Sequence, residues 1–247
     1  MQSIFQVHIL LAGLLLTSIT WAGSSEKDHM SEQRQQMAQA IEQSVRNSAQ
    51  YTGLNVLSDR VMNVMGEVPR EEFVPASHRH LAYENTPQPI EAGQTISQPL
   101  IVALMTELLD PQAGDIVLEV GTGSGYQAAV LAKLVAHVYS VEIVTILAES
   151  AKATLQRLGY SNVSVRAGDG YAGWPEKAPF DGIIVTAAAE HIPQPLLDQL
   201  KPGGKLVIPV GEEHGFQELL SVTVGADGKI EKKSVLPVRF VPLTGER

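Results

Sequence analysis

A glycine-rich turn between an apolar segment and a helical segment is the feature that most limits the fold. Residues 115–120 read DIVLEV, which is typical of a buried strand, and GTGSG at 121–125 follows directly before YQAAVLA. Gly121, Gly123 and Gly125 let the chain turn sharply and let its backbone approach a ligand, because no Cβ atoms stand in the way. Taken alone, the turn could also join a strand to a helix without binding anything.

The same alternation of strand and helix continues downstream. Four more short apolar strands are predicted, over residues 137–141, 163–166, 180–186 and 205–210. A Pro-led helix is expected over 191–200, and two β-rich segments, 218–224 and 234–241, form an antiparallel pair at the end. Buried strands alternating with helices indicate a doubly wound α/β fold, here a Rossmann-like, mostly parallel sheet of about seven strands.

The chain before this core is predicted to be helical. Residues 24–110 form a helical extension with an active-site loop, and residues 111–247 form the core domain. Met37, Ile41 and Val45 recur every four residues, which is typical of an amphipathic surface helix.

A further helix is expected over residues 57–65, and another over 100–109. Ser97 is a candidate N-cap of the second helix, and Pro99 fits its first turn. The segment VPREEFVP at 68–75 has prolines near both ends and is expected to be extended or turn-like.

Residues 1–23 resemble a secretory signal. The apolar segment Ile9–Ile19 precedes a small-x-small pattern at Thr20–Ala22, but it is shorter than the helix of about 20 residues that spans a bilayer. No stable membrane span is therefore expected. Because no Lys or Arg precedes the segment, an over-extended start, with translation from Met30 or Met37, is the alternative.

Composition excludes several classes of function. The 247 residues are 44% hydrophobic, enough for a full core, and their net charge of −9 does not suit a protein that binds duplex nucleic acid. The absence of cysteine excludes disulfides, thiolate metal sites and cysteine nucleophiles. His78 and His80 form the only H-x-H motif, without further ligands at a suitable spacing, so no metal site is expected.

Carboxylates follow the next two predicted strands. Glu142 ends the second strand, where it could accept both hydroxyls of a ribose, and Asp169 follows the third, where it could reach an adenine amino group. Each is more often a solvated loop end or a helix cap when taken alone. Because the carboxyl ends of parallel strands meet at one edge of the sheet, the turn and the two acids together predict an adenosine site.

The identity of the adenosine cofactor depends on the glycine spacing. The dinucleotide fingerprint needs glycine at the third place of G-x-G-x-x-G, where this chain has Tyr126. The pattern here, E-x-G-x-G-x-G from Glu119 to Gly125, resembles the first motif of class I methyltransferases. S-adenosylmethionine is therefore favoured as cofactor over NAD.

Nucleic-acid methyltransferases fit poorly. Those that methylate amino groups carry an acidic, Asn or Ser residue, two prolines and an aromatic residue after the fourth strand, where this chain reads VTAAAEHIP (185–193). The cytosine-C5 type needs a cysteine, which the chain lacks.

Separated sequence blocks point to one family within this class. From about Met37 onward the chain resembles the protein-L-isoaspartate O-methyltransferases, through VPREEFVP, GQTISQP, VLEVGTGSGYQAAVLA, GDGYAGWPEKAPFD, IIVTAA, LKPGGKLVIPVG and FVPLTG. It departs from the family pattern in the leader and at Asn85 and Gln88. The resemblance implies methyl transfer to the α-carboxylate of L-isoaspartyl residues in damaged proteins and peptides, leading to repair through a succinimide.

The resemblance also implies the roles of individual residues. The Ser97 hydroxyl would hold the substrate carboxylate, and Glu119 would orient the glycine turn. The cofactor would be bound by Gly121, Thr122, Gly123, Ser124, Gly125, Glu142, Gly168, Asp169 and Gly170. Contacts with the substrate would come from Thr95, Ile96, Thr186, Ala187, Ala188, Val241 and Thr244.

Three alternatives from other classes stay open at this point: a small-molecule methyltransferase, an NAD-dependent oxidoreductase and a non-catalytic adenosine-binding module. The expected partners are isoaspartyl proteins and peptides, without nucleic acid, and the protein is expected to be a monomer. Because S-adenosylmethionine is a cytoplasmic metabolite, the cytoplasm is favoured; export is the alternative if the leader is a true signal.

Overall fold

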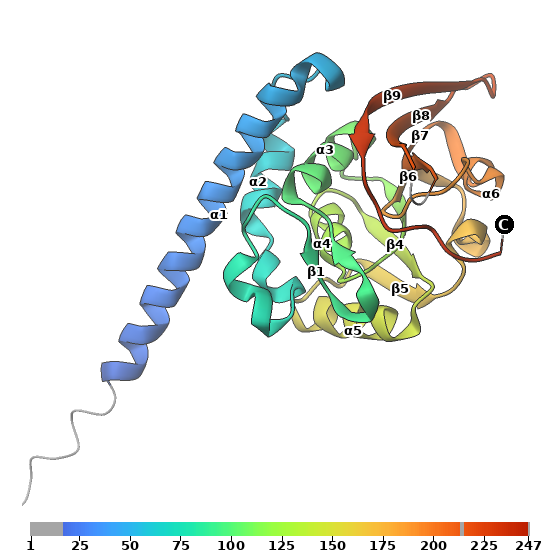
Figure 1. The fold of residues 1–247 in the computed structure, drawn as a ribbon. Coiled ribbons are helices and arrows are strands. Elements are labelled where there is room, and N and C mark those ends of the chain that lie inside the picture. Colours follow the sequence, from blue (N-terminus) through green and yellow to red (C-terminus); the bar gives the residue numbers. More distant parts are fainter. Residues whose placement is uncertain (1–16, 213–214, 247) are drawn as a thin grey trace, which may run out of the picture.

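The computed structural model describes residues 17–212 and 215–246, with side chains in the first helix from His29 onward (Figure 1). Residues 1–16, which hold most of the signal-like leader, lie outside the described part. Helix α1 (Thr17–Thr52) runs without a break across the boundary predicted between residues 23 and 24. Within the described residues, no helix is both long and apolar enough to cross a membrane.

A seven-stranded sheet with the order β5-β4-β3-β6-β7-β8-β9 forms the centre of the protein and confirms the predicted fold class. Its first four strands along the chain are β3 (Ile116–Val120), β4 (His137–Glu142), β5 (Val163–Ala167) and β6 (Phe180–Val185). These are followed by β7 (Leu200–Gly211), β8 (Gln217–Val224) and β9 (Ile230–Val238). Strands β3 to β7 pair in parallel, β8 is antiparallel to β7, and β9 is antiparallel to β8.

Helices and loops bury both faces of the sheet. Side chains such as Val117 and Val138 belong to a core shared with α1, α2 (Asp59–Glu67), α3 (Pro99–Leu109) and α4 (Tyr126–Ala132). Alternate side chains such as Leu118 belong to a second core, which includes Leu196 of α6 (Gln194–Asp198) and Leu243 of the C-terminal segment. Helix α5 (Thr145–Arg157) packs against β4 and β5. Burial on both faces explains why the parallel strands are apolar without alternation.

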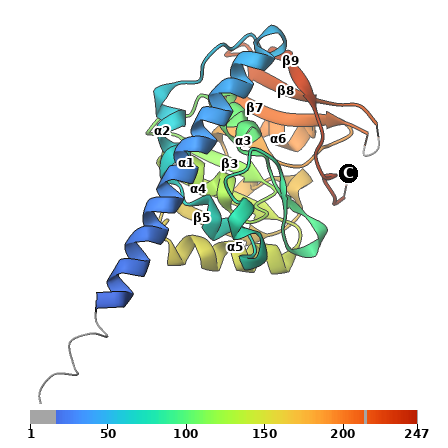
Figure 2. The same ribbon diagram turned by 60° about the vertical axis from the view of Figure 1, so that its left-hand side comes forward.

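The N-terminal helix packs onto the domain along one stripe. Met37, Ile41 and Val45 are at most 2% exposed, which confirms the predicted amphipathic pattern. Figures 1 and 2 show α1 lying along α2 and α3, while its N-terminal end projects from the body of the protein. The second helix begins at Asp59 because the Ser58 hydroxyl caps it by accepting a hydrogen bond from the Val61 N–H.

The start of α3 differs from the prediction. Ser97 is not its N-cap: that position is held by Gln98, whose side chain makes no capping hydrogen bond, and Pro99 opens the helix. Asn85 provides the cap instead, because its Oδ1 accepts the Leu100 N–H at 3.0 Å. The cap comes from a residue far away in the sequence, which local pattern reasoning does not consider.

Three boundaries near the C-terminus were also wrong. The helix expected over 191–200 is limited to α6, and β7 already begins at Leu200, where it pairs with Phe180 before a register shift. The last strand ends at Val238, its final pairing partner being Gln217 of β8. Beyond it the chain leaves the sheet edge and forms a bridge between Pro242 and Ala188.

The segment VPREEFVP, expected to be extended or turn-like, contains the single 3-10 turn η1 (Arg70–Phe73). A second 3-10 segment, η2 (Ala76–Leu81), follows it. Two short strands, β1 (Gln88–Pro89) and β2 (Thr95–Ile96), then pair antiparallel and lead the chain to Ser97.

The burial of the α1 stripe can be tested by truncation. We expect Ile41→Ala to lower the free energy of unfolding by about 2–5 kcal/mol, because a fully buried aliphatic side chain is lost and a cavity is left. Urea denaturation measures this change. The exposed neighbour Gln39, replaced by Ala, serves as the control and should shift the value by less than about 0.5 kcal/mol. Equal effects of the two substitutions would contradict the packing of α1.

Candidate active site

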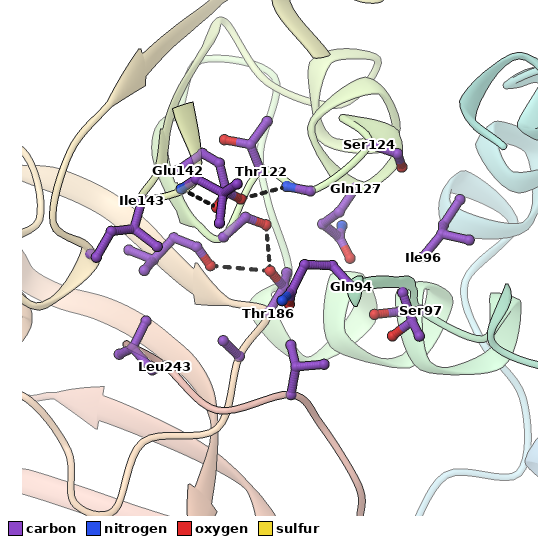
Figure 3. A pocket seen from close by; sticks show the side chains of 18 of the residues that line it. Gln94, Ile96, Ser97, Thr122, Ser124, Gln127, Glu142, Ile143, Thr186 and Leu243 are labelled. Atoms are coloured by element: carbon purple, nitrogen blue, oxygen red, sulfur yellow. Dashed lines mark hydrogen bonds between the residues drawn. The ribbon is translucent and has the colours of Figure 1, made fainter. Parts of the chain in front are cut away.

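A cavity lies at the carboxyl ends of β3, β4 and β6, and its space of about 870 Å³ includes its open mouth. Its lining comes from seven separate segments of the chain. Of the residues predicted from the sequence, those that line it are Thr95, Ile96, Ser97, Gly121, Thr122, Gly123, Ser124, Glu142, Gly170, Thr186, Ala187, Val241 and Thr244. Figure 3 shows several of these side chains converging on the space between the glycine turn and the loop of Ser97.

The glycine turn requires residues without a Cβ. Gly121, Gly123 and Gly125 have φ values of 93°, 53° and 90°, which side chains of L-residues rarely allow. A Cβ at Gly121 would also lie 2.5 Å from the Thr186 Oγ1. That hydroxyl donates to the Gly121 carbonyl at 2.5 Å, so the end of β6 is held against the turn that follows β3. Gly125 does not line the cavity but directs the chain into α4.

Glu142 ties the end of β4 to the same turn. Its side chain is buried, and its Oε2 accepts the Gly123 N–H at 2.8 Å while its Oε1 accepts the Val144 N–H at 3.0 Å (Figure 3). An ionised carboxylate has about four acceptor positions, so both oxygens keep room for a further donor. Glu142 can therefore shape the turn and bind hydroxyl groups of a ligand at the same time.

Glu119 lies behind the turn rather than in the cavity. The Ser140 hydroxyl donates to its Oε2, and Ser140 is in turn 2.5 Å from the hydroxyl of Thr122, which lines the cavity. Its Oε1 has no hydrogen-bond partner in the described part of the chain. Burial raises the pKa of Glu119 to about 8, with repulsion by Glu142 as a further cause, so the carboxyl is protonated at neutral pH. Glu119 reaches the turn through Ser140, a contact that the sequence did not indicate.

Three other predicted residues also lie outside the lining. Gly168 and Asp169 are absent from it, although Gly170 is present. The Asp169 carboxylate accepts the Tyr171 N–H at 2.9 Å and the Glu246 N–H at 2.7 Å, which ties the C-terminal segment to the end of β5. Ala188 contributes through its backbone, which donates to the Val241 carbonyl and accepts from the Leu243 N–H.

Ser97 occupies the position expected of a ligand-binding hydroxyl. It lines the cavity and is half-buried, and within the described residues its hydroxyl makes no hydrogen bond. Its carbonyl accepts a hydrogen bond from the Arg70 Nη2 at 2.7 Å. Because Ser97 does not cap α3, its side chain has no structural task among the described contacts.

Sequence reasoning missed about a third of the cavity wall. The additional lining residues are Gln94, Val102, Val120, Tyr126, Gln127, Val141, Ile143 and Val144, whereas Pro242 and Leu243 lie between the predicted Val241 and Thr244. Ile143 is the most informative, since it is a large apolar side chain that is 39% exposed and faces the cavity directly after Glu142. An apolar residue immediately after a strand-ending acid was a signal that could have found it.

A second cavity of about 1020 Å³ adjoins the first. Four residues line both of them: Thr95, Ser97, Thr186 and Val241. The rest of the second cavity is formed mostly by apolar residues of α3 and of segment 236–240. Among the described residues, Arg239 is the one charged side chain that lines it. The shared residues therefore form a wall between the two spaces.

Comparisons with known proteins show which family this chain resembles. A family model described as protein-L-isoaspartate(D-aspartate) O-methyltransferase matches residues 39–247. The chain is 55% identical over 234 residues to "Protein-L-isoaspartate O-methyltransferase 2" of Syntrophobacter fumaroxidans, covering 94% of this chain and 95% of that protein. It is 56% identical over 211 residues to a Polaromonas protein of the same name, covering 85% and 100% of the two chains.

Solved structures give the same result. One described as a protein-L-isoaspartate O-methyltransferase superposes with a TM-score of 0.73 at 31% identity, over 86% of this chain and 66% of that one. A beta-aspartate methyltransferase from Plasmodium falciparum, solved with S-adenosyl-L-homocysteine, superposes with a TM-score of 0.68 at 28% identity, over 83% of this chain and 97% of that one.

The raised pKa of Glu119 predicts a dependence of stability on pH. Because the pKa is raised from 4.5 to about 8 in the folded state, stability is lost as pH rises through that window, by about 1 kcal/mol per pH unit for a single group. We expect Glu119→Gln to remove this component. Urea unfolding of both proteins at pH 6, 7 and 8 measures it, since the other titrating groups cancel in the difference. A difference in stability that stays constant with pH would contradict a neutral Glu119.

Proposed function

The chain belongs to the protein-L-isoaspartate(D-aspartate) O-methyltransferase family, and on that premise we propose that it methylates the α-carboxyl of L-isoaspartyl residues in proteins and peptides, with S-adenosylmethionine as methyl donor. The methyl ester then cyclises to a succinimide, and its hydrolysis returns part of the material to normal aspartate. The observation that carries the proposal is the wall between the two cavities, which contains an unengaged serine hydroxyl, Ser97.

The residues around the first cavity fit S-adenosylmethionine. Gly121 and Gly123 line the cavity without side chains, and the Glu142 carboxylate keeps acceptor positions for ribose hydroxyls. Ile143 offers an apolar surface for the adenine ring. Asp169, beside Gly170, remains our proposed partner of the adenine amino group, through acceptor positions not used by the Tyr171 and Glu246 amides. When bound, the cofactor supplies an electrophilic methyl group on a sulfonium.

The protein needs little chemistry of its own for the transfer. A carboxyl group with an ordinary pKa of about 4 is already ionised at neutral pH, so no general base is required. The task of the protein is to align acceptor, methyl group and sulfonium, and such positioning can supply about 7–11 kcal/mol. We assign the binding of the acceptor carboxylate to the Ser97 hydroxyl, with Thr95 and Ile96 on the same loop.

The second cavity is the proposed entrance for the peptide. Thr186, Ala187 and Val241 leave only small or short side chains on the acceptor side of the wall, so that a peptide backbone can come close. The apolar lining of the second cavity can accommodate flanking side chains of the peptide. Thr244 closes the first cavity from the C-terminal segment.

We further propose a cytoplasmic protein that acts as a monomer and binds no nucleic acid. The cofactor is a cytoplasmic metabolite, and the net charge of −9 opposes binding to a polyanion. We divide the chain into a leader (1–23), an extension (24–110) that carries the Ser97 loop, and a core (111–247) that carries the cofactor residues.

The substrate can be tested with matched peptides. We expect label from radioactive S-adenosylmethionine to enter an isoaspartyl peptide and not its normal aspartyl twin, because only the former presents its carboxylate at the proposed position. The label should be lost on mild alkaline treatment, because alkali hydrolyses a methyl ester. Labelling of small metabolites with no labelling of the isoaspartyl peptide would instead favour a small-molecule methyltransferase.

Two substitutions separate binding of the acceptor from binding of the cofactor. We expect Ser97→Ala to lower turnover at least tenfold with little change in affinity for S-adenosylhomocysteine, since the loss of a positioning contact acts on alignment. Glu142→Ala should weaken that affinity at least tenfold, because it removes the proposed ribose acceptor and the Gly123 contact. Calorimetry and steady-state kinetics measure the two effects. Equal loss of affinity in both variants would overturn these assignments.

A further inference from the structure

Arg70 is a buried cation that the mechanism above does not use. It is the first residue of η1, and its side chain is 0% exposed. Its Nε donates to the Ala82 carbonyl at 2.8 Å, and its Nη2 donates to the Ser97 carbonyl at 2.7 Å. The guanidinium is thus bound directly to the backbone of the residue that we expect to hold the acceptor.

The charge of Arg70 has no ionic partner within the described residues, where it forms no salt bridge. Burial lowers its pKa to about 10, so it is still protonated at neutral pH. Burying an unpaired charge is costly, and neutral residues of similar volume would fill the space more cheaply. Packing alone therefore does not account for an arginine at this position.

The flat face of the Arg70 guanidinium packs on a residue at the cofactor side of the site. The Arg70 Cζ lies 4.7 Å from the centroid of the Tyr126 ring, a cation–π contact. Tyr126 is buried, lines the first cavity and is the first residue of α4, directly after Gly125. One side chain therefore joins the Ser97 loop to the helix that begins at the glycine turn.

Among the described hydrogen bonds, the neighbouring residue Asn85 holds other residues of the loop and not Ser97. Asn85 holds Gln98 and Leu100, since its Oδ1 accepts the Leu100 N–H and its carbonyl accepts from the Gln98 side chain. Ser97 itself is held by Arg70. A planar guanidinium can donate to two carbonyls in its plane while its face packs on a ring, which the single ammonium of a lysine cannot reproduce.

We propose that Arg70 is a positioning residue for methyl transfer, which fixes the Ser97 loop relative to the glycine turn. The proposal rests on the proposed function, because it concerns the alignment of acceptor and cofactor. A displacement of about 1 Å at a reacting centre can cost on the order of 100-fold in rate. The loss of Arg70 should therefore affect turnover far more than cofactor binding.

The test compares Arg70→Lys and Arg70→Met with the wild type. We expect turnover of the isoaspartyl peptide to fall at least tenfold in both variants and further in the methionine variant, while affinity for S-adenosylhomocysteine stays within about threefold. Thermal unfolding shows whether each variant is folded. Hydrogen exchange of residues 93–98 provides a second readout, and we expect it to accelerate in this loop without a matching change in the central strands.

Arg166 is a matched control. Its guanidinium also packs on an aromatic ring, with 4.3 Å between Cζ and the Trp174 ring centroid, and it also donates to a backbone carbonyl, that of Gly173, at 2.8 Å. It lines neither of the two cavities. Arg166→Lys should therefore keep turnover within about twofold of the wild type and leave exchange in residues 93–98 unchanged.

Three results would overturn the proposal: wild-type turnover in Arg70→Lys, loss of cofactor affinity in proportion to turnover, or an equal loss of turnover in Arg166→Lys. If the lysine variant does not fold, Arg70→Gln, which keeps a donor and removes the charge, is tested by the same criteria. A wild-type protein that labels no isoaspartyl peptide would refute the proposed function instead, so the two failures can be told apart.

Discussion

The hydrogen bond from the Thr186 hydroxyl to the Gly121 carbonyl is the contact on which the rest of the site depends. It joins the end of β6 to the turn after β3, and its 2.5 Å length leaves no space for a Cβ at position 121. Glu142 approaches the same turn from β4 and fixes it through the Gly123 N–H. Three strand ends are thereby held around one short stretch of backbone, and the first cavity opens beside it. A parallel sheet makes this possible, because it brings the carboxyl ends of its strands to one edge.

The sequence predicted the parts of this arrangement that follow from backbone geometry. The strands, the glycine turn and the position of Glu142 were recognisable, because apolar runs, glycine spacing and strand ends are local patterns. The partners of buried polar side chains were not. Ser97 looked like a helix cap because it precedes Pro99, yet Asn85 takes that task from a distant loop. Asp169 was expected at the adenine, a role that we still propose, but the sequence did not indicate that its carboxylate also accepts the Glu246 N–H. Such pairings are decided by tertiary packing, which a single sequence does not encode at any fixed spacing.

Two buried ionisable side chains near the glycine turn, Glu119 and Arg70, respond differently to the free-energy cost of burying a charge. Glu119 lies behind the turn and becomes neutral, since burial raises its pKa to about 8 and leaves one oxygen without a partner in the described part of the chain. Arg70 keeps its charge, because even a pKa lowered to about 10 is well above neutrality, and the charge is solvated by two carbonyls and the Tyr126 ring. A neutral acid avoids repulsion with Glu142, whereas a retained cation can bind loop carbonyls strongly. In both cases buried contacts hold the turn, and neither residue places a second charge inside the first cavity.

Rigidity matters here because the proposed reaction offers the protein few other means of acceleration. The acceptor is already ionised and the methyl group is already activated, so relative placement is what remains to be supplied. In our proposal the N-terminal extension serves that end: Arg70, Asn85 and Ser97 all lie before the first strand of the central sheet, while the proposed cofactor residues lie after it. The acceptor loop and the cofactor turn are therefore separate stretches of chain that must be packed together. A buried arginine that contacts both is the kind of connection that such a division requires, and the hydrophobic core that helices α1 to α3 share with the sheet holds the two stretches together as well.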